Sequence, residues 1–186
     1  MGKYISINGF MGCGKSSVGE RLAGRLSCGL TDLDRYIEEK SGRQIKEIFA
    51  SEGEAAFRRM EKEALKEILG KEERKGAMPS GVVSLGGGTV TTPECAGMVK
   101  DLTVCIYLRA GTDTLVENLR NDFSSRPMLE NPDGEQALRA RIEELMSIRS
   151  RIYEDTASIT IDIDGKSFDE VTSEILSCLG LPTDRT

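Results

Sequence analysis

Apolar residues recur along this chain with two spacings, and the two spacings alternate. Short apolar runs typical of buried strands occur at 3–8, 28–33, 82–85, 103–108 and 159–163. Between them, apolar residues fall three or four positions apart, as on one face of a helix, over 14–26, 34–40, 44–50, 54–69, 112–120, 135–153 and 168–179. The alternation predicts an α/β fold of three layers, a central parallel sheet of about five strands with helices on both faces.

Two polar stretches separate predicted elements. Residues 71–79 are charged and then turn-forming, so we expect a surface connection there. Residues 121–134 are polar and carry prolines and Gly134, so we expect a mobile loop that acts as a lid. No repeat, low-complexity tract or linker interrupts the chain, and residues 1–186 are predicted to form a single domain.

The composition is that of a soluble globular domain. The chain has 186 residues, 38% of them hydrophobic and 30% charged, which is sufficient for a full core. The net charge of −6 argues against a nucleic acid as partner. No apolar run could span a membrane, and no secretory signal opens the chain. We expect a cytoplasmic protein without a membrane partner, and a monomer because no exposed apolar stripe stands out.

The cysteines and the lack of histidine exclude several kinds of chemistry. The five cysteines are scattered, none lies in a C-x-x-C pair, and the chain contains no histidine. A zinc site is therefore not expected, and the thiols are predicted to be reduced. Ser-His and Cys-His catalysis is excluded, so proton transfer falls to a carboxylate, a lysine, a tyrosine or water.

A glycine-rich loop follows the first predicted strand. Residues 9–16 fit the G-x-x-x-x-G-K-S pattern of a phosphate-binding P-loop, between a predicted strand and a predicted helix. Lys15 would reach the β- and γ-phosphates, and the Ser16 hydroxyl would bind Mg²⁺. The predicted ATP-binding residues of the loop are Gly12, Cys13, Gly14, Lys15, Ser16 and Ser17. Cys13 is either a small residue in a tight loop or a thiol open to modification.

Two carboxylates end the second predicted strand, in the stretch TDLDRYIEE. If the strand is still extended there, Asp32 and Asp34 point to opposite faces, one toward a metal ion and the other toward a second substrate. Alternatively they are a helix N-cap and a first-turn acid, because aspartate is favoured at both positions. The residues alone leave both interpretations open.

Arginines in two predicted helices are candidate anion ligands. Arg58 or Arg59, in AFRRME, could bind a carboxylate as a fork, with Glu61 pairing with Arg58, or both could lie on a solvated charged face. Arg149 and Arg151 lie late in another helix, where the alternative is again an ordinary surface position, and we expect Arg151 to occupy one.

Glycines and a lid arginine complete the candidate site. Three consecutive glycines, Gly86, Gly87 and Gly88, follow a predicted strand and either admit a ligand close to the main chain or form a flexible turn. Arg126 lies in the predicted lid, where a cation can neutralise a transferring phosphoryl group. Because the carboxyl ends of parallel strands meet at one edge, we expect the P-loop, the aspartates and the glycines to converge.

The ordered motifs GFMGCGKSS, TDLDRYIEE, AFRRME, SLGGGTV, SSRPML and IRSRIYEDTA resemble those of the shikimate kinase family, small P-loop kinases related to the nucleoside monophosphate kinases. The likeness extends roughly from Lys3 to Leu179. It implies transfer of the γ-phosphoryl group of ATP to the 3-hydroxyl of shikimate, with Mg²⁺, in chorismate and aromatic amino acid biosynthesis. Shikimate and ATP would then be the small-molecule partners.

The resemblance also implies roles for matching residues. Asp34 would bind shikimate within a substrate segment at about 34–61, and Arg58 and Arg149 would hold its carboxylate beside Gly86, Gly87 and Gly88. Lys15, Asp34 and Arg126 would be catalytic. Arg120 and Arg126 would contact ATP, with Arg120 near adenine, and Ser16 and Asp32 would lie at the metal.

Two other functions fit part of the pattern. Another small-molecule kinase, such as a gluconate or nucleotide kinase, would share the P-loop and lid without needing Asp34, Arg58 and Arg149 around a hydroxy-carboxylate. A non-catalytic ATP-binding regulatory module would bind ATP without transfer and typically carries a damaged P-loop or lid. Here Lys15 and Arg126 are both present.

Overall fold

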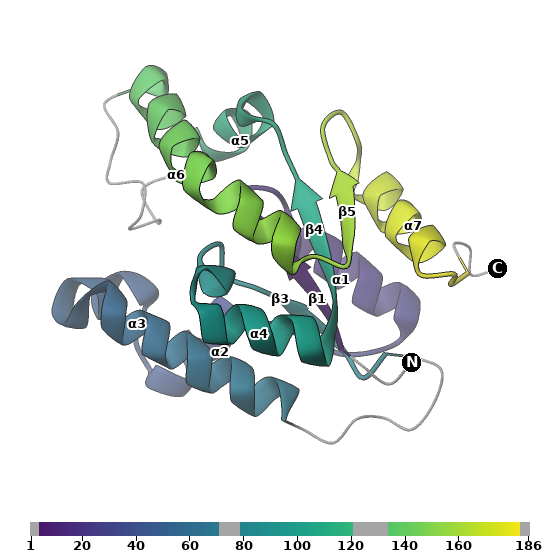
Figure 1. Ribbon diagram of the computed structural model, residues 1–186, viewed down its shortest axis with the longest axis horizontal. Helices are drawn as coiled ribbons and strands as arrows, with labels where there is room; N and C mark the ends of the chain where they lie inside the picture. Colours follow the sequence, from purple (N-terminus) through teal and green to yellow (C-terminus); the bar gives the residue numbers. More distant parts are fainter. Residues whose placement is uncertain (1–3, 71–78, 121–133, 183–186) are drawn as a thin grey trace.

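The computed structural model describes residues 4–70, 79–120 and 134–182. Its centre is one sheet of five parallel strands in the order β2-β3-β1-β4-β5 (Figure 1). The strands are β1 (Tyr4–Asn8), β2 (Leu30–Asp32), β3 (Val82–Ser84), β4 (Thr103–Arg109) and β5 (Ile159–Asp162). All five predicted strands are confirmed.

Helices cover both faces of the sheet. They are α1 (Lys15–Leu26), α2 (Leu33–Ser41), α3 (Ile45–Leu69), α4 (Pro93–Leu102), α5 (Thr112–Leu119), α6 (Glu135–Thr156) and α7 (Phe168–Cys178), with a short 3₁₀ turn η1 (Thr89–Thr91). Helices α1 and α7 pack together behind the sheet, whereas α4 and α6 lie in front of it, with α3 against α4 (Figure 1). The predicted three-layer α/β fold is confirmed.

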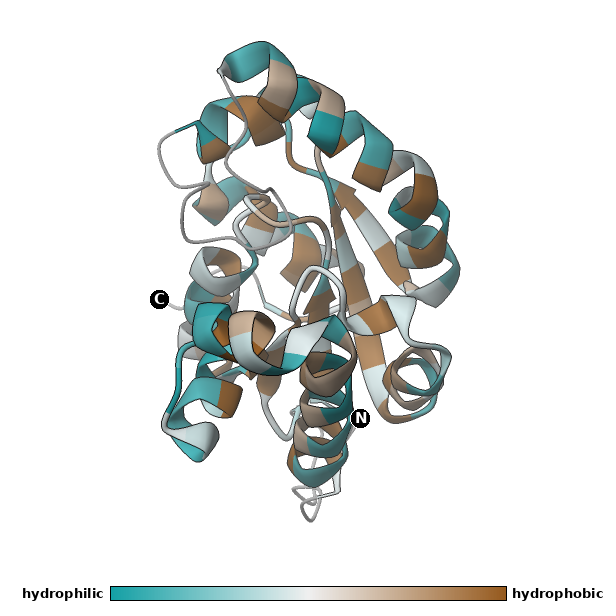
Figure 2. Cartoon of the chain, turned by 90° about the vertical axis from the view of Figure 1, so that its left-hand side faces the viewer, coloured by the Kyte–Doolittle hydropathy of each residue, from teal (hydrophilic) through white to brown (hydrophobic). Residues whose placement is uncertain are grey.

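The apolar periodicity explains this layering. Ile5 and Ile7 of β1 are fully buried, as are Val18 and Leu22 of α1, the helix that covers the strand. Figure 2 shows the hydrophobic residues concentrated on the strands and on the sheet-facing sides of the helices. The central position of β1 places the loop that follows it, residues 9–14, in the middle of the carboxyl edge of the sheet.

Helix α4 was not predicted, and the two helices predicted at 44–50 and 54–69 correspond to the single interrupted helix α3. The apolar spacing did not reveal α4, because Gly97 and several polar residues interrupt its apolar face. Pro93 in its first turn and the spacing of Cys95 and Val99, which are buried, are nevertheless typical of a helix. The two helices predicted at 44–50 and 54–69 together make up α3, in which Gly53 interrupts the helical backbone with φ 77° and ψ 175°. The predicted interruption is therefore correct.

Other expectations concern parts of the chain that the structure does not cover. The predicted lid at 121–134 lies outside the described residues except for Gly134, and so does most of the predicted connection at 71–79. Among the helices of the described ranges, none is long and apolar enough to cross a membrane. The single-domain organisation stays a prediction.

Candidate active site

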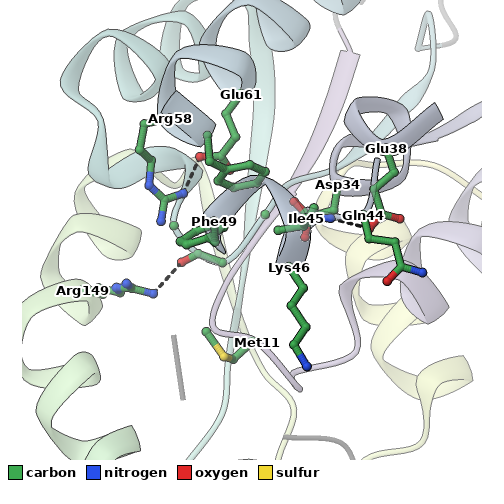
Figure 3. Close-up of a pocket in the computed structure, with 14 residues that line it drawn as sticks. Met11, Asp34, Glu38, Gln44, Ile45, Lys46, Phe49, Arg58, Glu61 and Arg149 are labelled. Carbon is green, nitrogen blue, oxygen red and sulfur yellow. Dashed lines mark hydrogen bonds and ion pairs between the residues drawn. The ribbon is translucent and has the colours of Figure 1, made fainter. Parts of the chain in front are cut away.

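Two adjoining pockets open at the carboxyl edge of the sheet. The first, here the P-loop pocket, has a volume of about 370 Å³ and is lined by P-loop residues together with Asp32, Ser84, Asn118 and Phe168. The second, here the arginine pocket, has a volume of about 350 Å³ and lies between α2, α3, α6 and the glycine turn (Figure 3). The residues common to both linings are Met11, Asp34 and Gly87. Two ligands in these pockets would therefore meet at this shared boundary.

The P-loop has the backbone geometry that phosphate binding requires. Gly12 and Gly14 have φ 81° and 85°, in the left-handed region that favours glycine, and Gly14 caps the N-terminus of α1. The Lys15 ammonium donates to the carbonyl oxygens of Gly9 and Phe10 at 3.0 Å each. The loop thus presents a helix N-terminus and a lysine to the same pocket. Cys13 is 1% exposed, so its thiol lies beneath the loop.

Ser16 and Asp32 form a pair of oxygen ligands beside the P-loop. The Ser16 hydroxyl donates to Oδ2 of Asp32 at 2.6 Å. The other oxygen of Asp32 accepts from the backbone N–H of Arg35 at 3.2 Å, as an N-cap of α2. The two interpretations of Asp32 are therefore compatible, because one oxygen caps the helix and the other faces Ser16. Hard oxygen ligands next to a phosphate site suit Mg²⁺.

Asp34 lies in the first turn of α2 and lines both pockets. Its carboxylate approaches the glycine turn closely, since a Cβ on Gly86 would lie 2.7 Å from Oδ1. The two carboxylates therefore lie differently: of these two pockets Asp32 lines only the P-loop pocket, whereas Asp34 lies at their shared boundary.

Arg58 is held by two carboxylates of its own helix. Its guanidinium pairs with buried Glu61 and, at 2.9 Å, with Glu54, and its side chain is only 16% exposed. Burial lowers the pKa of Arg58, but Glu61 and Glu54 more than offset this, so the pKa is raised and the charge is retained. The solvated-face alternative is therefore wrong for Arg58, whereas neighbouring Arg59 is exposed.

Arg149 reaches the same pocket from α6. It is 6% exposed, and Nη1 donates to the carbonyl oxygen of Gly87 at 3.4 Å. The buried Tyr153 hydroxyl donates to the same carbonyl, and burial raises the pKa of Tyr153, so the phenol stays a donor at neutral pH. Figure 3 shows the guanidinium groups of Arg58 and Arg149 on one side of the pocket. Arg151, with a side chain 88% exposed, is the surface residue expected.

The three glycines make room for the charged side chains around them. A Cβ on Gly86 would lie 2.7 Å from Oε1 of Glu61, and a Cβ on Gly88 would lie 2.7 Å from Cζ of Arg58. A Cβ on Gly87 would meet the backbone nitrogen of Met11 at 3.2 Å. The turn therefore packs closely against the Arg58–Glu61 pair, and the flexible-turn alternative is not supported.

Replacing Gly88 by alanine tests this packing. The new methyl group collides with a guanidinium that two carboxylates hold in place, so Arg58 must shift. We expect the KM for a small acid bound in the arginine pocket to rise about tenfold, with the KM for a nucleotide on the P-loop within about twofold of wild type. Steady-state kinetics with each substrate varied in turn measures both. Gly97→Ala is the control, because a Cβ there meets nothing within 4 Å.

Two predicted ATP contacts remain outside this picture. Arg126 lies outside the described residues. Arg120 is an exposed residue that directly follows α5 and is not among the described residues that line the P-loop pocket. Both roles stay predictions.

Several lining residues were missed by the sequence analysis. They are Met11, Ser84, Leu85, Asn118 and Phe168 around the P-loop pocket and Glu38, Gln44, Ile45, Lys46, Phe49 and Phe57 in the arginine pocket. The sequence gives no indication that Met11 or Lys46 lines a pocket, since neither belongs to a motif with a spacing typical of ligand binding. Phe168 does have such an indication: it is a large apolar residue at a helix start, and it remains 39% exposed.

Comparison with known proteins agrees with this geometry. The shikimate kinase family model matches residues 11–180. A shikimate kinase of Thermus thermophilus is 39% identical over 178 residues, covering 95% of this chain and 89% of the relative. A shikimate kinase of Geobacter sulfurreducens is 36% identical over 174 residues, covering 94% of this chain and 89% of the relative.

Solved structures give the same result. A shikimate kinase from Acinetobacter baumannii in complex with shikimate superposes with a TM-score of 0.84 at 30% identity, covering 95% of this chain and 92% of that one. A shikimate kinase from Bacteroides thetaiotaomicron gives a TM-score of 0.83 at 26% identity, covering 96% and 99% of the two chains. The matched sequence, the fold and the arginine pocket beside a P-loop together show that the chain belongs to the shikimate kinase family.

Proposed function

We propose that this protein transfers the γ-phosphoryl group of ATP to the 3-hydroxyl of shikimate, giving shikimate 3-phosphate and ADP, a step of chorismate and aromatic amino acid biosynthesis. The observation that carries the proposal is the shared boundary of the two pockets at Met11, Asp34 and Gly87. A nucleotide on the P-loop and a small acid in the arginine pocket would bring their reacting groups together there.

Shikimate binds in the arginine pocket through its carboxylate. Arg58 and Arg149 are two guanidinium groups from different helices that face one pocket, and a guanidinium fork matches a carboxylate. Asp34, at the opposite boundary of the pocket, accepts a hydrogen bond from the hydroxyl that attacks. The glycine turn at Gly86, Gly87 and Gly88 packs against the ring side of the substrate.

ATP binds with its phosphates on the P-loop. The backbone at Gly12, Cys13 and Gly14 and the start of α1 at Lys15–Ser17 hold them, and Lys15 leaves its loop carbonyls to reach the γ-phosphate. Arg120 lies near adenine, and Arg126 contributes from the lid. Each of these roles extends the family resemblance to this chain.

Ser16 and Asp32 are the residues that would hold Mg²⁺. Their oxygens, one hydroxyl and one carboxylate, lie 2.6 Å apart at the P-loop. That fits Mg²⁺, which takes one or two protein oxygens together with phosphates and water. When bound, the ion neutralises charge on the β- and γ-phosphates.

The chemical step relies on positioning and charge. The 3-hydroxyl oxygen forms a bond to the γ-phosphorus as the bond from that phosphorus to the β–γ bridging oxygen breaks, and ADP leaves. Asp34 orients the hydroxyl and accepts its proton as the new O–P bond forms, while Lys15 and Arg126 neutralise the moving phosphoryl group. Asp34, Lys15 and Arg126 are thus the proposed catalytic residues.

We also propose a monomeric cytoplasmic enzyme without a nucleic-acid partner, on the grounds of its net charge of −6 and its apolar pattern.

ADP release from Mg–ATP tests the function. Shikimate, gluconate and nucleoside monophosphates are offered in parallel, and the product is identified by ³¹P NMR. Release with shikimate alone, and a phosphate on the 3-oxygen, is expected. Turnover on gluconate or a nucleotide instead would reassign the kinase, and ATP binding without any turnover would favour a regulatory module.

A further inference from the structure

The first residue of the 3₁₀ turn after the three glycines has a fully buried hydroxyl. Thr89 is 0% exposed, and its backbone N–H donates to the carbonyl oxygen of Gly86 at 3.1 Å, which closes the turn. The side-chain hydroxyl is not used in the turn. It donates instead to Oε1 of Glu61, in α3, at 2.7 Å.

Glu61 is the residue that this hydroxyl holds. It is 1% exposed, and while Oε1 accepts from Thr89, Oε2 accepts from Arg58. A buried carboxylate depends on its hydrogen-bond donors, and two donors on different oxygens restrict the rotation of the whole group. The three side chains therefore form a continuous chain, Thr89–Glu61–Arg58, that ends at the arginine pocket.

The orientation of Arg58 depends on the hydrogen bonds of the series Thr89–Glu61–Arg58. Glu54, the other carboxylate that contacts Arg58, accepts from Nε at 3.2 Å and from Nη2 at 2.9 Å, but its side chain is 49% exposed, so solvent screens this pair. Glu61 is the buried partner and pairs with Nη1, so a shift of the Glu61 carboxylate would displace the guanidinium at its least solvent-screened contact. The hydrogen bonds that link Thr89, Glu61 and Arg58 do not require Thr89 to touch a ligand, and Thr89 does not line the arginine pocket.

We propose that Thr89 is a positioning residue for carboxylate recognition: its hydroxyl fixes Glu61, and through Glu61 the guanidinium of Arg58 that binds the shikimate carboxylate. The inference rests on the proposed function for the identity of the carboxylate. It makes the affinity for shikimate depend on a hydroxyl that shikimate does not contact. Threonine and serine satisfy this role equally, because each supplies the donor, whereas valine and alanine do not.

Steady-state kinetics of Thr89→Val and Thr89→Ser provides the test. We expect Thr89→Val to raise the KM for shikimate about tenfold, with kcat and the KM for ATP within about twofold of wild type. Thr89→Ser restores the wild-type KM. Thr103→Val is the matched control, because Thr103 is a buried threonine at the opposite end of the sheet whose hydroxyl donates to Val99. Thr89→Ala serves as the second hydroxyl-free variant if valine overpacks the turn, and thermal melting establishes folding for each.

A carboxylate-free analogue separates positioning from general damage. Shikimate with a neutral carboxamide in place of the carboxylate should bind wild type and Thr89→Val with the same dissociation constant, measured by calorimetry. A similar loss of affinity for shikimate and for the amide would overturn the proposal, as would an unchanged KM in both hydroxyl-free variants.

A double-mutant cycle tests whether Thr89 acts through Arg58. If Thr89 acts through Arg58, the effect of Thr89→Val on shikimate binding disappears in an Arg58→Lys background, whereas additive effects contradict the proposal. Absence of turnover by wild type would reject the proposed function alone. The dissociation constants of shikimate for wild type and Thr89→Val would still decide the role of Thr89.

Discussion

Replacing Asp34 by asparagine is expected to lower kcat for shikimate phosphorylation by about 10²–10⁴-fold. The substitution preserves the size of the side chain and its place at the boundary of the two pockets, but it removes the charge that we propose orients the hydroxyl and receives its proton. The KM for ATP should change little, because the P-loop contacts are untouched. Initial rates of ADP release at saturating substrates measure the effect.

The control for Asp34→Asn is the same change at Asp155. Asp155 pairs at 3.8 Å with exposed Arg151 and lies away from both pockets. Asp155→Asn should retain the wild-type kcat. Near-normal turnover by Asp34→Asn would show that Asp34 takes no part in the chemical step. The boundary of the two pockets would then have no proposed catalytic side chain, since Met11 and Gly87 are its other residues.

The second large effect is expected for Arg58→Lys. Lysine keeps the positive charge but loses the planar fork, so it cannot bind Glu61 and a substrate carboxylate with parallel hydrogen bonds at once. Hydrogen bonds to charged groups contribute about 1.5–3 kcal/mol each, so the KM for shikimate should rise about 10- to 100-fold. The KM for ATP should stay within about twofold of wild type.

Arg59→Lys is the matched control for that variant. Arg59 is the next residue of the same helix and is exposed, and it lines neither pocket. Wild-type kinetics are expected for it. Unchanged shikimate kinetics in Arg58→Lys would reject Arg58 as the carboxylate anchor and leave Arg149 and Lys46 as the candidate cations of the pocket.

The fold could be predicted because its strands are short, apolar and well separated. Each predicted strand corresponds to an observed one, and the P-loop follows the central strand β1. Helix α4 was missed because its apolar face has only two fully buried members, Cys95 and Val99, in a segment interrupted by Gly97. Periodicity detects long amphipathic faces and loses short ones.

The site was predictable only where a motif has fixed spacing. The P-loop residues form one consecutive segment, and Gly12 and residues 14–17 line one pocket, whereas the buried Cys13 does not. Arg58 was ambiguous, because a charged residue in a helix reveals nothing of its burial until Glu61 and the glycine turn are placed around it. Thr89 had no signal at all, since its contact with Glu61 joins residues 28 positions apart.

The most direct measurement is a crystal structure of the protein with shikimate and Mg–ADP. We predict the shikimate carboxylate within about 3 Å of guanidinium nitrogens of both Arg58 and Arg149. The 3-hydroxyl should hydrogen-bond to Asp34 and face the nucleotide across the Met11–Gly87 boundary. Shikimate bound in the reverse orientation, with its carboxylate toward Met11 and no contact with either arginine, would contradict the account.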